Sequence, residues 1–285
     1  MSNFSRLQKI AIVSLSALGG GITYYQLNSG KSERKFDVYN SWTTNYTPSV
    51  KWDQNWDHRQ PEYLLKPLKK DESPENQNFR NEDIEKSRST AVRHLLLIRH
   101  GQYNTKGSTD KDRYLTELGK QQADFTGQRL ALLDFKFDEV VSSTMTRAQE
   151  TTHLIMKHLP ENIEVKNCQL LEEGAPIPPE PPVGHWRPEA KQFFQDGARI
   201  EAAFRKYFHR APPEQTNDTY TLLVCHANVI RFFVCKALQF PPEGWLRIAL
   251  NHASITWVSI MPNGNVVLRT LSDSGHMPPK HVTNR

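Results

Sequence analysis

The chain has 285 residues, of which 37% are hydrophobic, 10% aromatic and 24% charged. This composition excludes a wholly disordered chain, and the length suits one large domain with an extension rather than two full-sized domains. The formal charge of +5 at pH 7 favours an anionic ligand, a phosphoprotein or a membrane surface, but no dense Lys/Arg cluster occurs, which excludes nucleic acid as the expected partner.

The first apolar segment is Ile10 to Leu27, which contains no charged residue. About 18 to 20 residues in a helix rise roughly 30 Å, enough to cross a bilayer core. We therefore predict an N-terminal transmembrane anchor in residues 1–30. A secretory signal peptide is the alternative, but no convincing small-residue cleavage site follows the segment. The basic, acid-free start is compatible with mitochondrial import.

Residues 31–90 are polar and read as a tether that cannot bury much apolar area on its own. Within it, Trp52-Asp53-Gln54-Asn55-Trp56-Asp57 places two tryptophans four residues apart. On a helix they would share one face and offer a docking surface. Packing of the tryptophans back onto the parent domain is an equally good interpretation of the pattern.

Periodic hydrophobic patterns begin at Val92 and predict alternating strands and helices. The expected strands are His94–Ile98, Glu139–Ser142 and Tyr220–Cys225; the expected helices are Thr116–Leu133, Met145–His158 and Asn228–Leu238. A hairpin of Ile255–Ile260 and Val266–Leu271 closes the chain. This order predicts an α/β domain in residues 91–285, with a mostly parallel sheet, helices on both faces and a site beyond the carboxyl ends of the strands.

Two further features of this region bear on function. Gly174 to Pro188 holds six prolines and reads as a rigid loop bordering a cleft rather than as a ligand for a proline-binding module. The cysteines Cys168, Cys225 and Cys235 are odd in number and include no C-x-x-C pair, which disfavours a disulfide framework or a zinc cluster. We expect three buried thiols.

Polar residues follow three of the predicted strands. Arg99 and His100 follow the first strand, Arg147 lies shortly after the second, and His226 follows the third, while Glu173 opens the proline-rich loop. Two histidines and two arginines at one sheet edge would form an electropositive pocket that the fold does not need for stability.

Such a pocket suits phosphoryl transfer, and we expect neither metal nor cofactor in it. Arginine forks match phosphate oxygens, and a neutral imidazole such as that of His100 can attack phosphorus to form a phosphohistidine. One carboxyl group can protonate the leaving oxygen and then deprotonate the incoming water, and Glu173 is the candidate.

These residues resemble the histidine phosphatase superfamily of phosphoglycerate mutase. The likeness rests on four motifs in order: Leu97-Ile98-Arg99-His100-Gly101, Leu115-Thr116 with Gly119 and Gln122-Ala123, Ser142-Ser143 with Arg147-Ala148 and Glu150-Thr151, and His226. From about residue 90 onward the chain is most similar to the mitochondrial serine/threonine protein phosphatases of that superfamily, through Leu171–Ile177, Gly197–Ala202, Cys225–Arg231 and Gln239–Arg247.

The resemblance implies a protein phosphatase that acts on phosphoserine and phosphothreonine proteins and is held to a mitochondrial membrane by a single span. It also implies roles for individual residues: His100 as nucleophile, Glu173 as acid/base, and Arg99, Arg147 and His226 as phosphate ligands. Finally, it implies a homo-oligomer joined through the tryptophan motif, that is, Trp52, Asp53, Asn55, Trp56 and Asp57.

Other activities fit the motifs less well. Tyr103 and Lys106 stand where mutases of the superfamily carry Ser and Asn, which disfavours a small-molecule mutase or phosphomonoesterase, and the acid phosphatase branch expects a His-Asp pair where this chain has His226-Ala227. Cys225 and Arg231 satisfy the C-x5-R spacing of cysteine-based tyrosine phosphatases, but bulky residues fill the interval. A membrane-tethered oligomeric scaffold with weak or no catalysis is the remaining alternative.

Overall fold

The computed structural model describes residues 50–65, 74–184 and 187–284. Trp52–Arg285 form one compact unit. The predicted membrane span at residues 10–27 lies outside the described residues. Within the described ranges, no helix is long and apolar enough to cross a bilayer.

A six-stranded sheet in the order β3-β2-β4-β1-β5-β6 forms the centre of the domain. The strands are β1 (Arg93–Arg99), β2 (Phe137–Ser143), β3 (Val165–Cys168), β4 (Thr219–Cys225), β5 (Ile255–Ile260) and β6 (Val266–Asp273). β1 to β4 pair in parallel, whereas β5 pairs antiparallel with both β1 and β6. The predicted α/β fold with a mostly parallel sheet is confirmed.

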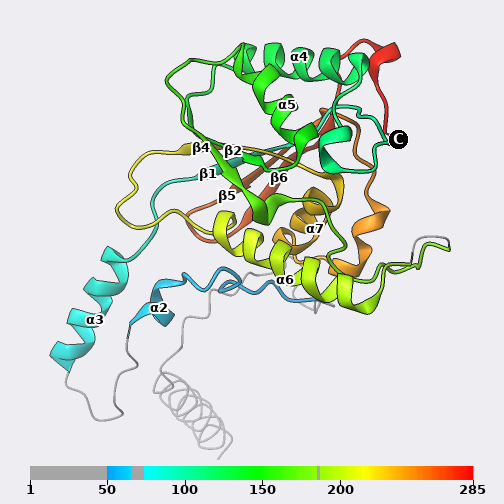
Figure 1. Ribbon diagram of the computed structural model, residues 1–285. Helices are drawn as coiled ribbons and strands as arrows, with labels where there is room; N and C mark the ends of the chain where they lie inside the picture. The colour runs from blue at the N-terminus through cyan, green and yellow to red at the C-terminus, as the bar shows by residue number, and fades with distance from the viewer. Residues whose placement is uncertain (1–49, 66–73, 185–186, 285) are drawn as a thin grey trace, which may run out of the picture. The chain divides into compact units, whose positions relative to one another are not determined.

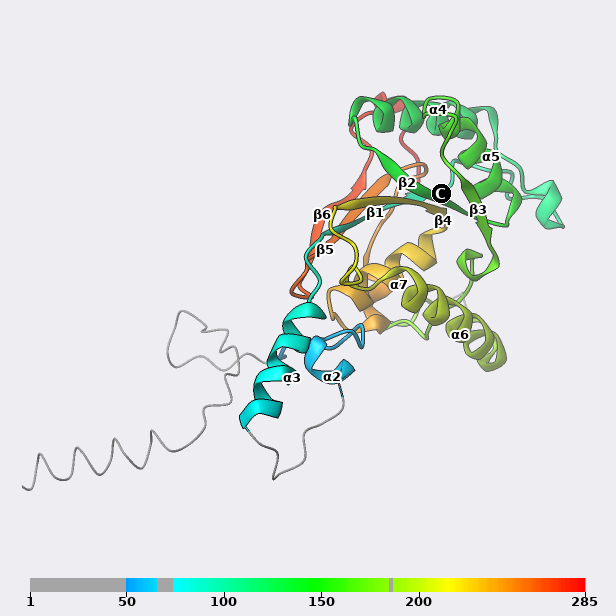
Figure 2. The same cartoon turned by 90° about the vertical axis from the view of Figure 1, so that its left-hand side faces the viewer.

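Helices cover both faces of this sheet (Figures 1 and 2). The long helices are α4 (Glu117–Leu132), α5 (Thr146–Met156), α6 (Ala190–Tyr207) and α7 (Ala227–Ala237). Leu95 and Leu97 of β1 pack in a core with residues of α6 and α7, while Leu96 and Ile98 belong to a second core on the opposite face. Because both faces are covered, β1 is a continuous apolar run, and each buried leucine contributes about 1.5–3 kcal/mol.

Local signals explain where two of the helices begin. Thr116 caps α4, since its hydroxyl accepts a hydrogen bond from the Gly119 N–H at 3.0 Å. Met145, the N-cap residue of α5, makes no side-chain capping hydrogen bond. Instead, the carboxylate of Asp110 accepts hydrogen bonds from the N–H of Thr146 at 2.9 Å and from its hydroxyl at 2.8 Å. The start of α5 therefore depends on a tertiary contact.

Several elements of the structure are absent from the sequence-based prediction. β3 is an edge strand with three exposed residues and one buried one, so it has little apolar pattern. α6 buries Ile200, Ala203, Phe204 and Tyr207 at helical spacing, which is a signal present in the sequence. The polar segment also contains two helices, α2 (Pro61–Leu64) and α3 (Pro74–Lys86). Short 3-10 turns occur at Asp110–Asp112, Gln169–Leu171, Pro242–Arg247 and Pro279–His281.

The tryptophan motif is not helical; Trp52 and Asp53 are irregular, and residues 54–57 form a turn. The indole N–H of Trp56 donates to the Gly264 carbonyl at 2.8 Å, and its ring packs against Phe204, 6.0 Å away between centroids. The expectation of a shared helical face is therefore wrong. Trp56 packs onto its own domain, and Trp52 lies partly buried against the same core.

Asp57 holds the tryptophan motif against the domain through a buried ion pair with Arg210. The Asp57 carboxylate accepts hydrogen bonds from Arg210 Nη2 at 2.7 Å, from Nε at 3.1 Å and from the backbone N–H at 2.8 Å. Its side chain is 0% exposed. Arg210 Nη2 also donates to the Gln54 carbonyl at 2.6 Å. Residues 52–57 are thus a structured part of the compact unit, not a free tether.

Candidate active site

The predicted site residues meet at the carboxyl edge of the parallel strands. Arg99 is the last residue of β1 and pairs in register with Cys225, the last residue of β4, so that His100 and His226 emerge side by side. Their ring centroids lie 5.2 Å apart. The prediction that these strand ends converge is confirmed.

His100 is buried, with only 2% of its surface exposed. Its Nδ1 lies 2.8 Å from the Gly101 carbonyl oxygen, an acceptor, so Nδ1 bears the proton and Nε2 keeps its lone pair. Burial, with the charges of His226, Arg147 and Arg99, holds the pKa of His100 well below its ordinary value. The imidazole is consequently neutral near pH 7, as a nucleophile requires.

The glycine after His100 is dictated by close packing against α4. A Cβ at Gly101 would lie 2.5 Å from the Gly119 carbonyl oxygen, and a Cβ at Gly119 would collide with the Gln102 carbonyl. The Gly101 N–H donates to the Thr151 hydroxyl at 3.0 Å. Residues 101 and 119 therefore need to be glycine because the loop after β1 rests on α4.

Arg99 is 8% exposed and is held by the C-terminal part of the chain. Its Nη1 donates to the carbonyls of Leu250 at 2.6 Å and Asn284 at 3.2 Å, and Nη2 lies 3.0 Å from His252 Nε2. Burial and the Arg99 charge lower the pKa of His252 to about 3, so His252 is neutral and accepts. Arg99 Nε is buried without a hydrogen-bond partner.

Arg147, near the start of α5, is also buried, at 3% exposure. Its guanidinium lies over the ring of Tyr103, 4.8 Å from the centroid, and the same ring meets His100 edge-on at 5.0 Å. Nη2 contacts the Met145 sulfur at 3.4 Å, and Nη1 lies 3.5 Å from Asp110 Oδ1. Arg147 Nε has no hydrogen-bond partner. Tyr103, which stands where mutases of the superfamily carry Ser, thus contacts both His100 and Arg147.

His226 is fully buried at the N-terminus of α7. Its Nε2 lies 2.8 Å from the Ser143 hydroxyl, while Nδ1 is buried without a partner. The pKa of His226 lies well below its ordinary value, mainly because the ring is buried and also because Arg147 and Arg199 carry positive charge. Ser143 therefore orients His226 and leaves one ring nitrogen for a ligand.

Glu173 joins the site from the loop after β3. Its Oε1 accepts from the N–H groups of Gly174 at 3.3 Å and Asn228 at 3.2 Å. Burial raises the pKa of the carboxyl group, and the charges of Arg147, Arg99 and Arg231 oppose that shift. A raised pKa suits a carboxyl group that must donate a proton.

Arg199 of α6 fixes the loop that bears Glu173. Its Nη1 donates to the Glu172 carbonyl at 2.6 Å and its Nη2 to the Glu173 carbonyl at 3.1 Å. Further along the loop, the Trp245 indole donates to the Ile177 carbonyl at 2.9 Å. These bonds hold the proline-rich segment against the domain, as expected of a rigid loop.

The structure brings together all five residues predicted for catalysis and phosphate binding, and it adds others. His252 and Tyr103 contact site residues, and Arg231, with Nε unpartnered, interacts electrostatically with Glu173. Arg231 lies five residues after His226, so its position on α7 was a usable signal. His252 precedes β5 in a loop that no sequence pattern pointed to.

The structure contradicts a cysteine nucleophile. Cys225 is fully buried in the core, and burial raises the pKa of its thiol, so the thiolate is not available. Residues 227–237 form α7 rather than a phosphate-cradling loop. Cys168 and Cys235 are buried and free as well, as expected.

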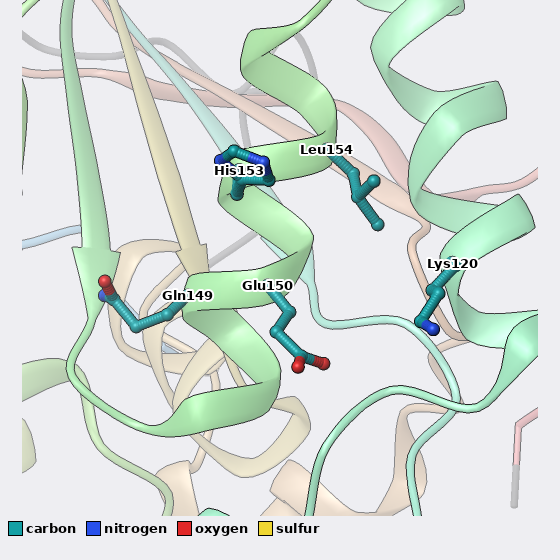
Figure 3. Close-up of a pocket in the computed structure, with 5 residues that line it drawn as sticks. All are labelled: Lys120, Gln149, Glu150, His153 and Leu154. Atoms are coloured by element: carbon teal, nitrogen blue, oxygen red, sulfur yellow. The ribbon is translucent and has the colours of Figure 1, made fainter.

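A separate pocket of about 450 Å³ lies between α4 and α5, and Figure 3 shows the residues that line it. Lys120 of α4 and four residues of α5 line it: Gln149, Glu150, His153 and Leu154. The side chains of Lys120 and Glu150 extend toward the space between the helices (Figure 3). None of the predicted site residues lines this pocket. In the described part of the chain, no group of three His, Cys, Asp or Glu side chains is placed to hold a metal ion.

Comparison with known proteins identifies the family of this chain. The histidine phosphatase superfamily (branch 1) matches residues 95–175 and 180–273. The mitochondrial serine/threonine-protein phosphatase Pgam5 of Drosophila willistoni is 55% identical over 94% of this chain and 93% of its own length, and that of Drosophila pseudoobscura pseudoobscura is 54% identical over 98% and 97%. The crystal structure of phosphoglycerate mutase from Plasmodium falciparum is 31% identical, with a TM-score of 0.48 over 67% of this chain and 96% of its own. The chain therefore belongs to branch 1 of the histidine phosphatase superfamily and, within it, to the Pgam5 family.

Proposed function

We propose that the protein is a serine/threonine protein phosphatase that works through a phosphohistidine on His100. The observation that supports it most directly is a set of buried donors without partners around that histidine: Arg99 Nε, Arg147 Nε and His226 Nδ1. A buried donor left unbonded costs roughly 1–3 kcal/mol. A bound phosphoryl group would accept hydrogen bonds from all three donors and would so explain why they lack partners within the protein.

In the first step, Nε2 of His100 attacks phosphorus, the N–P bond forms, and the bond from phosphorus to the serine or threonine oxygen breaks. Glu173, whose pKa is raised by burial, gives a proton to that leaving oxygen. Arg99, Arg147 and His226 donate hydrogen bonds to the phosphoryl oxygens and offset their charge. In the second step, Glu173 removes a proton from water, which attacks phosphorus and releases phosphate from His100.

Labelling tests this mechanism. Purified full-length chain incubated with a 32P-phosphoserine peptide and quenched in base should carry an acid-labile, base-stable label, and should release phosphate. His100→Ala should lose both label and turnover. His153→Ala, which removes an exposed histidine of α5 outside the site, should keep both. Label that persists in His100→Ala would refute the intermediate, and no turnover at any oligomeric state would favour the scaffold function.

The substrate class can be tested on the same protein. Tyr103 occupies space beside His100 and Arg147, so a small phosphorylated sugar acid would lack the contacts that a mutase site offers. We expect kcat/KM to be higher for phosphoserine and phosphothreonine peptides than for phosphoglycerate. The reverse order would favour a small-molecule phosphomonoesterase or mutase.

We further propose that residues 1–30 anchor the protein to a mitochondrial membrane and that residues 31–90 link the anchor to the catalytic domain. The mitochondrial names of the relatives support the compartment. Mitochondria isolated from cells that express the chain should retain it in the membrane pellet after carbonate extraction. A variant without residues 1–30 should move to the soluble fraction; retention in the pellet would refute the anchor.

We also propose that the tryptophan motif joins protomers into a homo-oligomer. Trp56 and Asp57 are buried in their own domain, so contacts to a partner would fall to Asp53, which is exposed, and to Asn55 and Trp52, which are half-buried. Light scattering should give a smaller particle for Trp52→Ala, with an unchanged circular dichroism spectrum. An unchanged particle size would contradict this role.

A further inference from the structure

Met145 lies between the phosphate-binding side and the proton-transfer side of the site. It immediately precedes α5, two residues before Arg147. Its sulfur accepts hydrogen bonds from Arg147 Nη2 at 3.4 Å and from the backbone N–H of Glu173 at 3.4 Å. The side chain is neither fully buried nor fully exposed. No step of the proposed mechanism uses this thioether.

From this geometry we propose that Met145 is an oxidation site through which peroxide reversibly switches off the phosphatase. The inference rests on the proposed function, because it takes Arg147 as a phosphate ligand. Its physical basis is the difference between a thioether, a weak acceptor, and a sulfoxide, whose oxygen is a strong and polar one.

The chemistry is a two-electron oxidation. The Met145 sulfur attacks one oxygen of hydrogen peroxide, the O–O bond breaks, a sulfur–oxygen bond forms, and the other oxygen leaves as water after proton transfer. Sulfur is oxidised and peroxide is reduced. Methionine sulfoxide reductases reverse the change with a dithiol as reductant, which becomes a disulfide and releases water.

The new oxygen would sit beside the two donors that the sulfur already contacts. A hydrogen bond from a charged guanidinium to a polar oxygen is much stronger than one to a thioether, so Arg147 would turn toward Met145 and away from the phosphate. The Glu173 N–H would be held in the same way. Both halves of the reaction would suffer from one modification.

The three cysteines and Met261 do not explain such an effect. The three cysteines are buried, and burial raises the pKa of Cys225 and Cys235, which protects their thiols. Met261 is a matched methionine, half-buried like Met145. Met261 directly follows Ile260 of β5, which pairs with Arg93 at the start of β1. His100 follows the other end of β1, so Met261 lies away from the site.

The experiment compares full-length wild type, Met145→Leu and Met261→Leu before and after hydrogen peroxide. Peptide mass spectrometry locates added oxygen, and kcat/KM is measured on a phosphoserine peptide. Wild type and Met261→Leu should lose roughly tenfold or more in kcat/KM, the scale of a lost charge-assisted contact, in proportion to oxygen on Met145. Methionine sulfoxide reductase should restore the rate, whereas dithiothreitol alone should not.

Met145→Leu should start at a reduced rate and then lose nothing further to peroxide. Equal fractional losses in Met145→Leu and wild type would overturn the proposal, as would a fully oxidised Met145 with unchanged kcat/KM. Orthophosphate binding, measured by calorimetry, separates this inference from the proposed function. A protein that binds phosphate but shows no turnover would contradict the proposed phosphatase function alone. In that case, weaker phosphate binding after oxidation of Met145 would support the effect of Met145 on Arg147, and unchanged binding would overturn it.

Discussion

The buried pair of Asp57 and Arg210 allows a quantitative test of how the tryptophan motif is held. We consider Asp57→Asn, which keeps the shape of the side chain and removes its charge. The carboxylate accepts three hydrogen bonds from Arg210 and one from the Arg59 N–H at 3.2 Å. The substitution leaves the Arg210 guanidinium, 5% exposed, without a counter-charge.

Removing one partner of a buried ion pair costs about 3–5 kcal/mol, because the other charge stays desolvated. Folded domains are stable by roughly 5–15 kcal/mol, so this loss is a large fraction of the total. The matched control is Glu117→Gln, which breaks an exposed pair with Lys120. Exposed pairs contribute about 0–1 kcal/mol, and we expect a loss in that range for the control.

Urea unfolding followed by circular dichroism measures both changes. A double mutant with Arg210→Met should lose less than the sum of the two single losses, since the stranded charge is gone. Additive losses, or a cost for Asp57→Asn no larger than for Glu117→Gln, would refute the reasoning.

The same pair predicts a pH dependence. Burial alone would raise the pKa of Asp57, but the hydrogen bonds and charge of Arg210 outweigh it and lower the pKa below the ordinary 3.8. For a carboxyl group with a lowered folded-state pKa, the stabilisation is present above the unfolded value and is lost as the pH falls through the folded value. Wild type should therefore approach Asp57→Asn in stability only in strong acid.

Three further predictions concern the site. Because the pKa of His100 is lowered and that of Glu173 is raised, kcat/KM should persist well below pH 6.5 and should decline as rising pH deprotonates Glu173. Glu173→Gln should be much slower and should lack this alkaline decline. A decline that survives in Glu173→Gln would exclude Glu173 as the acid. Gly119→Ala should lower the free energy of unfolding in urea by about 1–3 kcal/mol or more, because the new Cβ would collide with backbone atoms. Gly184→Ala, which has open space around it, should leave that free energy unchanged. Equal effects of the two substitutions would contradict the close approach of the loop after β1 to α4. Tyr103→Leu should raise KM for a phosphopeptide roughly tenfold or more by freeing Arg147, because a desolvated cation–π contact is worth about 2 kcal/mol. Tyr103→Phe should keep the wild-type KM. An unchanged KM in Tyr103→Leu would show that the ring does not position Arg147.

The sequence by itself determined five of the six strands of the sheet and the positions of the main site residues. The run Leu95–Ile98 is buried on both faces, so its strand was visible as a continuous apolar segment, and the polar residues that end the strands had to meet at one edge. Arg99, His100, Arg147 and His226 were accessible to prediction for that reason. The edge strand β3 was not, because its exposed residues leave no periodic signal.

The tertiary structure decided the contacts between distant segments. His252 meets Arg99, and Asp110 caps α5, across separations for which no local pattern exists. The tryptophan motif shows the limit most clearly: its spacing was compatible with a helix face, yet Trp56 packs on Phe204. Local periodicity records which residues are apolar, whereas only the folded chain fixes the partner that each buried group finds.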